Sequence, residues 1–254
     1  MNIKHFLIIP VFLINISSFS EGIIKKELEK CYSFYETVEN DLSIKNLVLL
    51  DSTLKKFINN LDSYEEIERA EGTIADYDIK YWEDKYRKIG IERAYSGPSL
   101  YYSNKFLADA HKIDPNSRYR KYTYFSTIFG IGDPSGLGMM PNVKEAYKYL
   151  KDFPDGPYID EVYLILARFH TDLFMVVRSL NNSEKDILDY KYDCYESYIE
   201  NKPYAVQMKD NQRIAVKFLR EFLKIHSNHK FRYPKNWLED LENGTIDCWS
   251  YCSD

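Results

Sequence analysis

The sequence predicts an all-α fold, a short superhelix of antiparallel helix hairpins. Apolar residues return at helical spacing along almost the whole chain, and no stretch keeps the strict alternation of a strand for long. Clusters of proline, glycine and asparagine separate these stretches by short gaps, which favours antiparallel neighbours. One helical pattern also returns further along the chain, as expected of a repeat protein.

The first 20 residues have the three parts of an export signal. Lys4 supplies the positive charge, residues 6–16 form an apolar run, and Ser18 and Ser20 supply small residues before Glu21. The run is too short to span a bilayer. We therefore expect residues 1–20 to be removed and residues 21–254 to form a single all-α domain in the periplasm, or outside the cell. The alternative is a buried N-terminal helix.

The first half of the mature chain predicts four helices. Apolar stripes run over residues 24–38 and 44–61. Ser63 followed by Glu66 is a capping box, which predicts a third helix continuing through Trp82. Gly97-Pro98 predicts the start of a fourth helix through Tyr102, and residues 114–117 predict its end.

The second half holds the clearest amphipathic pattern. Residues 143–153 and 158–180 read as two helices separated by the turn at 154–157, and residues 181–183 open the next helix. His170 lies inside the apolar stripe of the second helix. A single histidine has no second ligand beside it, so we interpret His170 as a packed side chain.

Residues 146–153 are echoed by residues 215–222. Every pair is identical or chemically similar except Tyr147 and Val216. The interval is close to twice the 34-residue period of tetratricopeptide repeats, so we interpret the echo as a repeat.

Residues 146–167, with their aromatic-proline-x-glycine turn at Phe153–Gly156, resemble a helix–turn–helix unit of bacterial periplasmic tetratricopeptide-like proteins. The outer-membrane assembly lipoproteins and the cell-division coordinator of the Tol–Pal system share that unit. Val162 stands where those repeats usually place alanine, and the lipid-attachment cysteine is missing. The resemblance implies an α-solenoid that binds an extended peptide or another protein without chemistry of its own.

Charge and motifs argue against several classes of function. With 34 basic and 39 acidic residues the net charge is −5, which disfavours nucleic-acid binding. The glycine-rich stretch 129–142 lacks the lysine of a phosphate-binding loop, so we interpret it as an insertion whose Asp133, Met139 and Met140 are candidate contacts. The sequence predicts no catalytic residues, metal or cofactor. A glycan-cleaving enzyme is the catalytic alternative, with an echo of lytic transglycosylases only at Glu196-Ser197.

Tyrosine is the compositional outlier, with 23 residues. Tyrosine offers a large contact area with a hydroxyl group, which suits interfaces, although most of these residues are expected to fill half-buried positions between helices. The candidate groove residues include a basic spot suited to a carboxylate or an acidic peptide; they are Tyr101, Tyr102, Arg118, Arg120, Tyr122 and Tyr124.

The four cysteines, in an exported chain, favour disulfides. The candidates are Cys31, Cys194, Cys248 and Cys252, and three connectivities are possible. A metal site that joins Cys248 and Cys252 to His226 and His229 is an alternative, although its spacing is not a standard zinc pattern. A fully reduced set is another.

Together these features predict an exported, non-catalytic scaffold or adaptor that binds a protein or peptide of the cell envelope. The main alternative is a cell-wall or glycan-binding module, in which the tyrosines stack on sugar rings. A eukaryotic secreted protein, glycosylated at Asn181 and Asn243, is a third possibility.

Overall fold

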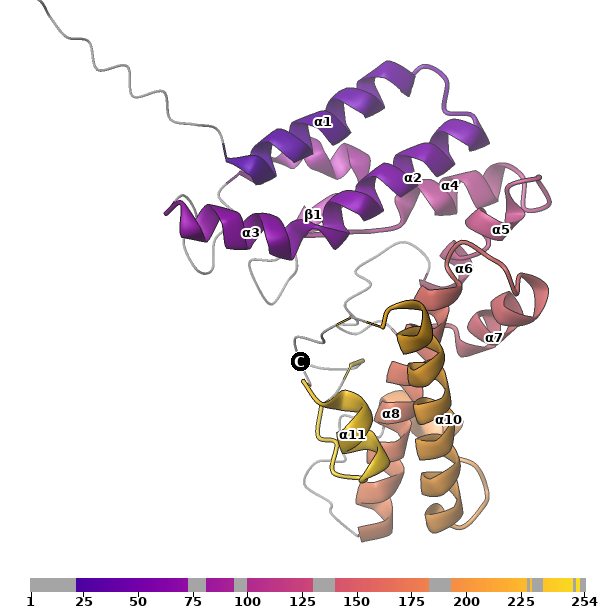
Figure 1. The fold of residues 1–254 in the computed structure, drawn as a ribbon. Coiled ribbons are helices and arrows are strands. Elements are labelled where there is room, and N and C mark those ends of the chain that lie inside the picture. Colours follow the sequence, from indigo (N-terminus) through magenta and orange to yellow (C-terminus); the bar gives the residue numbers. More distant parts are fainter. Residues whose placement is uncertain are drawn as a thin grey trace, which may run out of the picture.

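The computed structural model describes residues 22–72, 81–93, 100–129, 140–182, 193–227, 229, 235–248, 250 and 251. The described chain is mostly helical, as the sequence predicts (Figure 1). The predicted contact residues Asp133 and Met139, like the predicted signal peptide, lie outside the described residues.

We call residues 22–113 the N-terminal lobe. Its elements are α1 (Ile23–Val38), α2 (Ile44–Asn59), α3 (Leu61–Ala70), the 3-10 helix η1 (Asp84–Ile89), β1 (Ile91–Arg93), β2 (Leu100–Tyr102) and α4 (Lys105–Ile113). Helix α1 buries the residues of its apolar stripe, Ile24, Leu28 and Cys31. These side chains meet α2 and α4 in one apolar cluster, because the helix buries one face and leaves the other in water.

Two predicted helices differ from the structure. The predicted helix through Trp82 ends at Ala70, followed by Gly72 at φ 70. The predicted helix start at Gly97-Pro98 is also wrong, because residues 100–102 form a strand that pairs antiparallel with β1, with Ile91 opposite Tyr102. Leu100 and Tyr102 are buried while Tyr101 between them is half-buried, which is the alternation of a strand too short to be recognised by periodicity.

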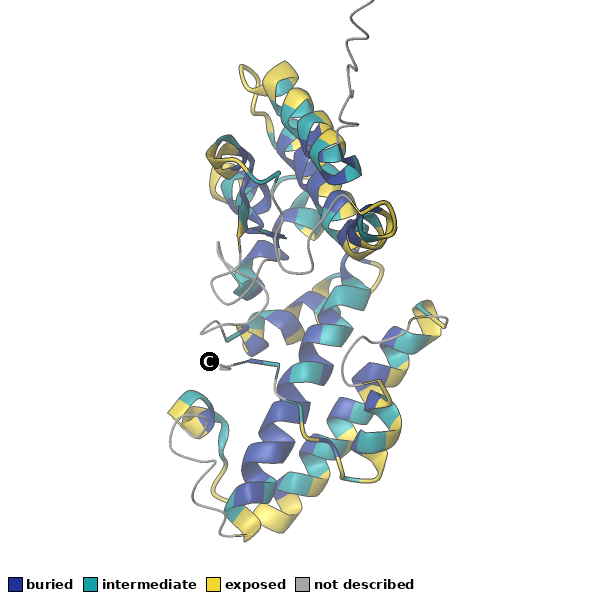
Figure 2. Ribbon diagram, turned by 90° about the vertical axis from the view of Figure 1, so that its left-hand side faces the viewer, coloured by how far each residue is buried: buried dark blue, intermediate teal, exposed yellow. Residues whose placement is uncertain are grey.

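We call residues 120–251 the C-terminal lobe. Its elements are α5 (Arg120–Thr123), α6 (Ser126–Phe129), α7 (Val143–Asp152), α8 (Ile159–Asn182), η2 (Glu196–Tyr198), α10 (Tyr204–Ile225) and α11 (Trp237–Glu242). Helix α8 lies at the centre and is buried along most of its length (Figure 2). Helix α10 lies beside α8, and the turn at 154–157 separates α7 from α8 as predicted.

The echoed segments 146–153 and 215–222 lie on α7 and α10. Two equivalent pairs are buried alike: Ala146 and Ala215 are both inaccessible, and Tyr149 and Phe218 are both in the core. The similarity in sequence therefore corresponds to a shared burial face.

The two lobes meet where α2 approaches the start of α8 and where α4 contacts α5 and α6. Val48 and Leu107 of the N-terminal lobe belong to the apolar cluster of the C-terminal lobe, and Ile44 packs against both clusters. Within the described residues, no helix combines the length and the apolar character needed to cross a membrane.

Candidate functional site

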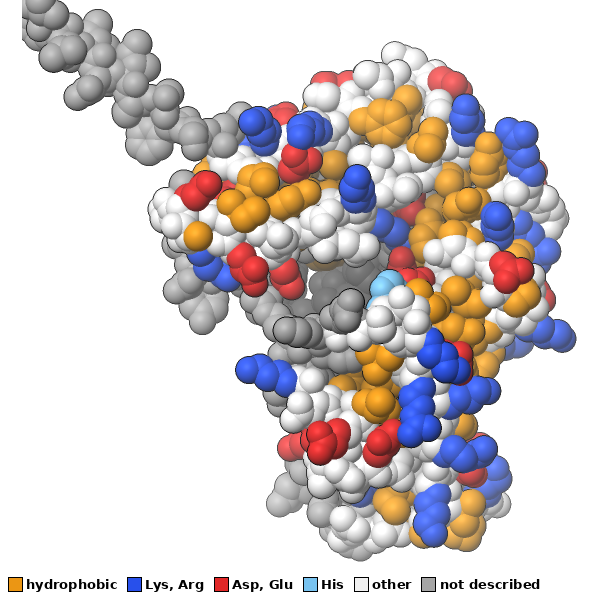
Figure 3. All heavy atoms as spheres, in the orientation of Figure 1, with side chains coloured by type: hydrophobic (Ala, Val, Ile, Leu, Met, Phe, Trp, Pro, Cys, Tyr) orange, Lys and Arg blue, Asp and Glu red, His pale blue; other side chains and the backbone are white. Residues whose placement is uncertain are grey.

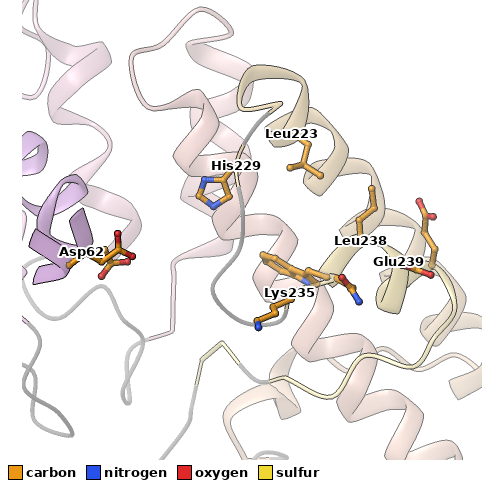
Figure 4. Close-up of a pocket in the computed structure, with 10 residues that line it drawn as sticks. Asp62, Leu223, His229, Lys235, Leu238 and Glu239 are labelled. Carbon is orange, nitrogen blue, oxygen red and sulfur yellow. The ribbon is translucent and has the colours of Figure 1, made fainter. Parts of the chain in front are cut away.

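A cleft of about 760 Å³ separates α3 from α10 and α11. Figure 3 shows the molecule hollowed between these parts, and Figure 4 shows Asp62 on one side and Leu223, Leu238 and Glu239 on the other. We call this cavity the acidic cleft. Its described lining residues are Asp62, Glu66, Leu223, His229, Lys235, Asn236, Trp237, Leu238, Glu239 and Glu242.

Acidic side chains dominate the charge of this cleft. Asp62 and Glu66 lie one helical turn apart on α3, and Glu239 and Glu242 lie one turn apart on α11. Among the described lining residues, Lys235 supplies a positive charge that opposes these four carboxylates. Glu242 accepts a 2.7 Å hydrogen bond from Arg220. Glu66 and Glu239 are exposed and have no ion-pair partner among the described residues. The cleft therefore presents a negative potential to solvent.

The apolar residues of the cleft come from the C-terminal lobe. Leu223 and Leu238 line it as partly exposed side chains. Trp237 is only 4% exposed, and its indole nitrogen donates to Thr171 of α8 at 3.3 Å. Trp237 therefore anchors α11 to α8, while the two leucines offer the apolar contact.

His229 does not offset the acidic charge. Its ring lies 5.2 Å from the Phe222 ring and 6.4 Å from that of His226. Burial lowers the pKa of His229, and the positive charges of His226 and Arg168 lower it further. His229 is consequently neutral at pH 7, and the acidic character of the cleft persists.

A second cavity, of about 190 Å³, lies between α2, β2, α6 and α8. We call it the inner recess. Lys55 enters it with its ammonium group 3.6 Å from the Tyr158 ring centre, 4.1 Å from that of Phe125 and 3.5 Å from Glu161. Burial raises the pKa of the Glu161 carboxyl group, and the charge of Lys55 opposes that rise. The positive charge of Lys55 is therefore already paired with one carboxylate and two aromatic ring faces.

Asp51 lies behind this recess and is fully buried. Its carboxylate accepts a 2.7 Å hydrogen bond from the Tyr158 hydroxyl, and the Lys55 ammonium group lies 3.9 Å away. Burial raises the pKa of Asp51, and Lys55, Tyr158 and Tyr102 counteract the effect. Because Asp51 has no exposed surface, a substrate could not touch it, and its contacts instead join α2 to the start of α8.

The structure separates the residues of the predicted groove. Tyr101 and Tyr102 line the inner recess, and Tyr122 lines a neighbouring surface hollow with Tyr158. Tyr124 is buried and hydrogen bonds to Glu145.

Of the basic candidates, Arg120 meets another predicted groove residue, since its guanidinium carbon lies 5.5 Å from the centre of the Tyr124 ring. Arg118 is exposed and bonds to the hydroxyl of Tyr119 at 3.0 Å. Arg120 lies 3.9 Å from Asp152, and Met140 packs against the core. Asp152 therefore partly neutralises Arg120, whereas Arg118 remains exposed.

Sequence reasoning did not find the acidic cleft or the Lys55 cluster. The pairs Asp62/Glu66 and Glu239/Glu242 are ordinary helical spacings in a chain with 39 acids, so no local signal distinguishes them. The interpretation of His170 as a packed residue is confirmed. Its Nδ1 donates to the Asn211 carboxamide oxygen at 2.7 Å and its Nε2 accepts from Tyr147 at 2.7 Å, since the Asn211 amide nitrogen donates elsewhere.

Cys31 and Cys248 are free thiols, so the structure does not include either of them in the disulfides that the sequence favours. Cys31 sits in the apolar face of α1, where burial raises its pKa to about 11. Cys194 is not one of the free thiols, and Cys252 lies outside the described residues. His226 bonds to Asp160 at 2.6 Å, and among the described residues no three metal-ligating side chains gather.

Comparison of the chain with family models, curated proteins and solved structures finds no match in any of the three. The functional argument therefore depends on the geometry of the two cavities.

Proposed function

We propose that this protein is an exported, non-catalytic scaffold or adaptor that binds a basic segment of another protein in the acidic cleft. The observation that carries the proposal is the lining of that cleft, with four carboxylates around two accessible leucines. The tetratricopeptide-like architecture is part of the same proposal, supported by the packing of α10 along α8 and by the two matched buried pairs on α7 and α10.

The chemistry of the cleft favours a particular kind of segment. Glu66 on α3 and Glu239 on α11 come from opposite lobes, so a lysine or arginine on each side of an apolar residue would meet both. The leucines between them would take the apolar side chain, whose burial contributes most of the affinity. A volume of about 760 Å³ is adequate for several side chains rather than a whole domain.

Export is supported by the N-terminal pattern of the sequence. Expression with a secretion system followed by N-terminal sequencing should give a mature protein that begins at Glu21. An intact Met1 terminus on an exported protein would contradict this part of the proposal.

The binding test uses fluorescence anisotropy with labelled peptides of the pattern Lys-Leu-Leu-Arg and their acidic counterparts. The double variant Glu66→Lys with Glu239→Lys should bind the basic peptide at least about tenfold more weakly, since two opposite charges become like charges. The matched control changes two exposed residues to lysine, Glu36 on α1 and Glu39 at its C-terminal cap, which gives the same net charge away from the cleft. Equal weakening in both variants would mean non-specific attraction and would overturn the cleft proposal.

A sedimentation assay with the same purified protein distinguishes the glycan-binding alternative from peptide binding. Tyr102 and Tyr124, which that alternative would use for stacking, are both buried. Sedimentation with insoluble peptidoglycan should leave the protein in the supernatant, and co-sedimentation would favour the glycan-binding function instead.

A further inference from the structure

The inner recess has a polar residue that the fold leaves without a partner. Asn104 is 5% exposed, lines the recess and makes no side-chain hydrogen bond within the described chain. Its backbone adopts the left-handed conformation at φ 55, which directly precedes α4. Because Asn104 lines the recess and its side chain bonds to no described residue, its amide group is available to hydrogen bond with a ligand there.

One face of α8 forms one wall of the recess. Glu161, Leu164, Ile165 and Arg168 line it at the spacing of a single helical face. Glu161 and Arg168 lie seven residues apart, or about 10 Å along the axis at 1.5 Å per residue. The recess is therefore acidic at one end, basic at the other and apolar between them.

The charged residues at the two ends of the recess differ in whether an opposite charge lies beside them. At the acidic end, Glu161 pairs with Lys55 at 3.5 Å. At the basic end, Arg168 lies against the neutral Tyr251 hydroxyl, and no carboxylate of the described chain lies within ion-pair distance of it. Its positive charge adds to the effect of burial in lowering the pKa of His229, and it opposes the rise that burial gives the pKa of Cys248. Arg168 is thus the recess cation that remains able to bind an anion.

We propose that the inner recess binds a small organic monocarboxylate with an apolar body. Its carboxylate would accept the paired hydrogen bonds of the Arg168 guanidinium group and the amide hydrogens of Asn104. Its apolar body would lie against Phe125, Phe129 and Ile165. A phosphate dianion fits less well, because it would need a second cation, and Lys55 is already held by Glu161 and Asp51.

The size of the recess limits the ligand. A cavity of about 190 Å³ has room for roughly six waters at ~30 Å³ each, or for one ring with a short chain. Such a carboxylate can be a free metabolite or the C-terminal residue of a peptide. This inference does not rest on the proposed binding of a basic segment, because the inner recess and the acidic cleft share no lining residue.

The test is calorimetric titration of the exported protein with 3-phenylpropionate and its neutral amide. The acid should bind saturably and the amide at least about tenfold more weakly, because the amide lacks the charge that Arg168 recognises. The same titration is repeated with a peptide that ends in phenylalanine, as the free acid and as the C-terminal amide. Stronger binding of the peptide acid than of 3-phenylpropionate would indicate that the carboxylate comes from a peptide C-terminus, and the reverse would indicate a free metabolite. Binding of either acid supports the site.

Three variants assign the binding to this recess. Arg168→Met keeps the length of the side chain without its charge and should weaken binding by about ten- to a hundredfold. Asn104→Gly should weaken it by a few fold and keep the fold, since glycine tolerates φ 55. The control Arg213→Met, on the exposed side of α10 with 76% of its side chain accessible, should bind as the parent does.

Thermal unfolding of each variant checks that it is folded. The proposal is overturned if neither acid binds saturably up to about 10 mM, well above the millimolar affinity expected of a weak ligand. It is equally overturned if acid and amide bind alike, or if Arg168→Met binds as the parent does.

Discussion

The Tyr158 hydroxyl donates a 2.7 Å hydrogen bond to the Asp51 carboxylate, which joins the start of α8 to the middle of α2. Both side chains are buried. The aromatic ring of Tyr158 also lies 3.6 Å from the Lys55 ammonium group, so one tyrosine contacts both members of the Asp51–Lys55 pair. This contact holds together the two lobes that border the acidic cleft and the inner recess.

Removal of that hydroxyl tests how far the lobes depend on it. Tyr158→Phe keeps the ring over Lys55 but leaves the Asp51 carboxylate with one donor fewer, which should lower the free energy of unfolding by about 1–3 kcal/mol. Urea titration measures this loss. The control Tyr204→Phe, at a residue 40% exposed, should change stability by less than about 0.5 kcal/mol. Equal stability of the two variants would contradict a structural role for the contact.

Asp172 of α8 should hold the C-terminal segment in place. Its carboxylate accepts from the Tyr195 hydroxyl at 2.7 Å and from the backbone amides of Ser250 and Tyr251 at 3.0 and 2.7 Å. Asp172→Asn replaces one carboxylate oxygen, which accepts hydrogen bonds, by an NH₂ group, which donates them. That NH₂ group would face the Tyr195 hydroxyl and the two backbone amides, which are themselves donors. Hydrogen exchange at the amides of Ser250 and Tyr251 should then accelerate by about tenfold or more. The exposed neighbour Asp247→Asn should leave those rates unchanged, and unchanged rates in Asp172→Asn would refute the contact.

Cys194 and Cys252 are expected to form the disulfide. Each is the sequence neighbour of a tyrosine, Tyr195 or Tyr251, that binds Asp172, and the other two cysteines are free. A peptide map without reductant should link Cys194 to Cys252 and show Cys31 and Cys248 as alkylated thiols. Because a long loop is closed, Cys194→Ser should cost roughly 4 kcal/mol of stability. A linked peptide that contains Cys31 or Cys248 would contradict this pairing.

The His170 network should make stability depend on pH in the acidic range. Burial lowers the pKa of His170, so the unfolded chain binds this proton at a higher pH than the folded protein does. Its contribution to stability is complete above about pH 6.5 and is lost as the pH falls through the folded pKa. The stability gap between the parent and His170→Gln should therefore narrow between pH 7.5 and 5.5, measured by urea titration.

Taking the difference between the two proteins cancels other titrating groups. Burial raises the pKa values of Asp51 and Glu161, whose folded forms keep their protons to a higher pH and change stability in the opposite direction. A gap that stays constant or widens on acidification would show that the Tyr147–His170–Asn211 network does not favour neutral histidine.

The helices could be predicted where the periodic pattern was long. The stripe of α8 and the turn at 154–157 were recognised because burial of one helical face imposes a regular spacing on the sequence. The strand Leu100–Tyr102 could not be recognised, because three residues carry no periodicity and its pairing with Ile91–Arg93 is a non-local contact. Tyr101 and Tyr102 were predicted as groove residues from the excess of tyrosine, and their place in the inner recess follows from that pairing.

The sequence by itself determined that this chain is helical, which helical faces are apolar and where the main turns lie, because these properties depend on neighbours within one or two turns. Only the tertiary structure decided that Glu66 and Glu239 border one cleft, and that Asn104 and Arg168 face one recess. Those residues are distant along the chain, and their charges acquire a common function only when the two lobes pack together.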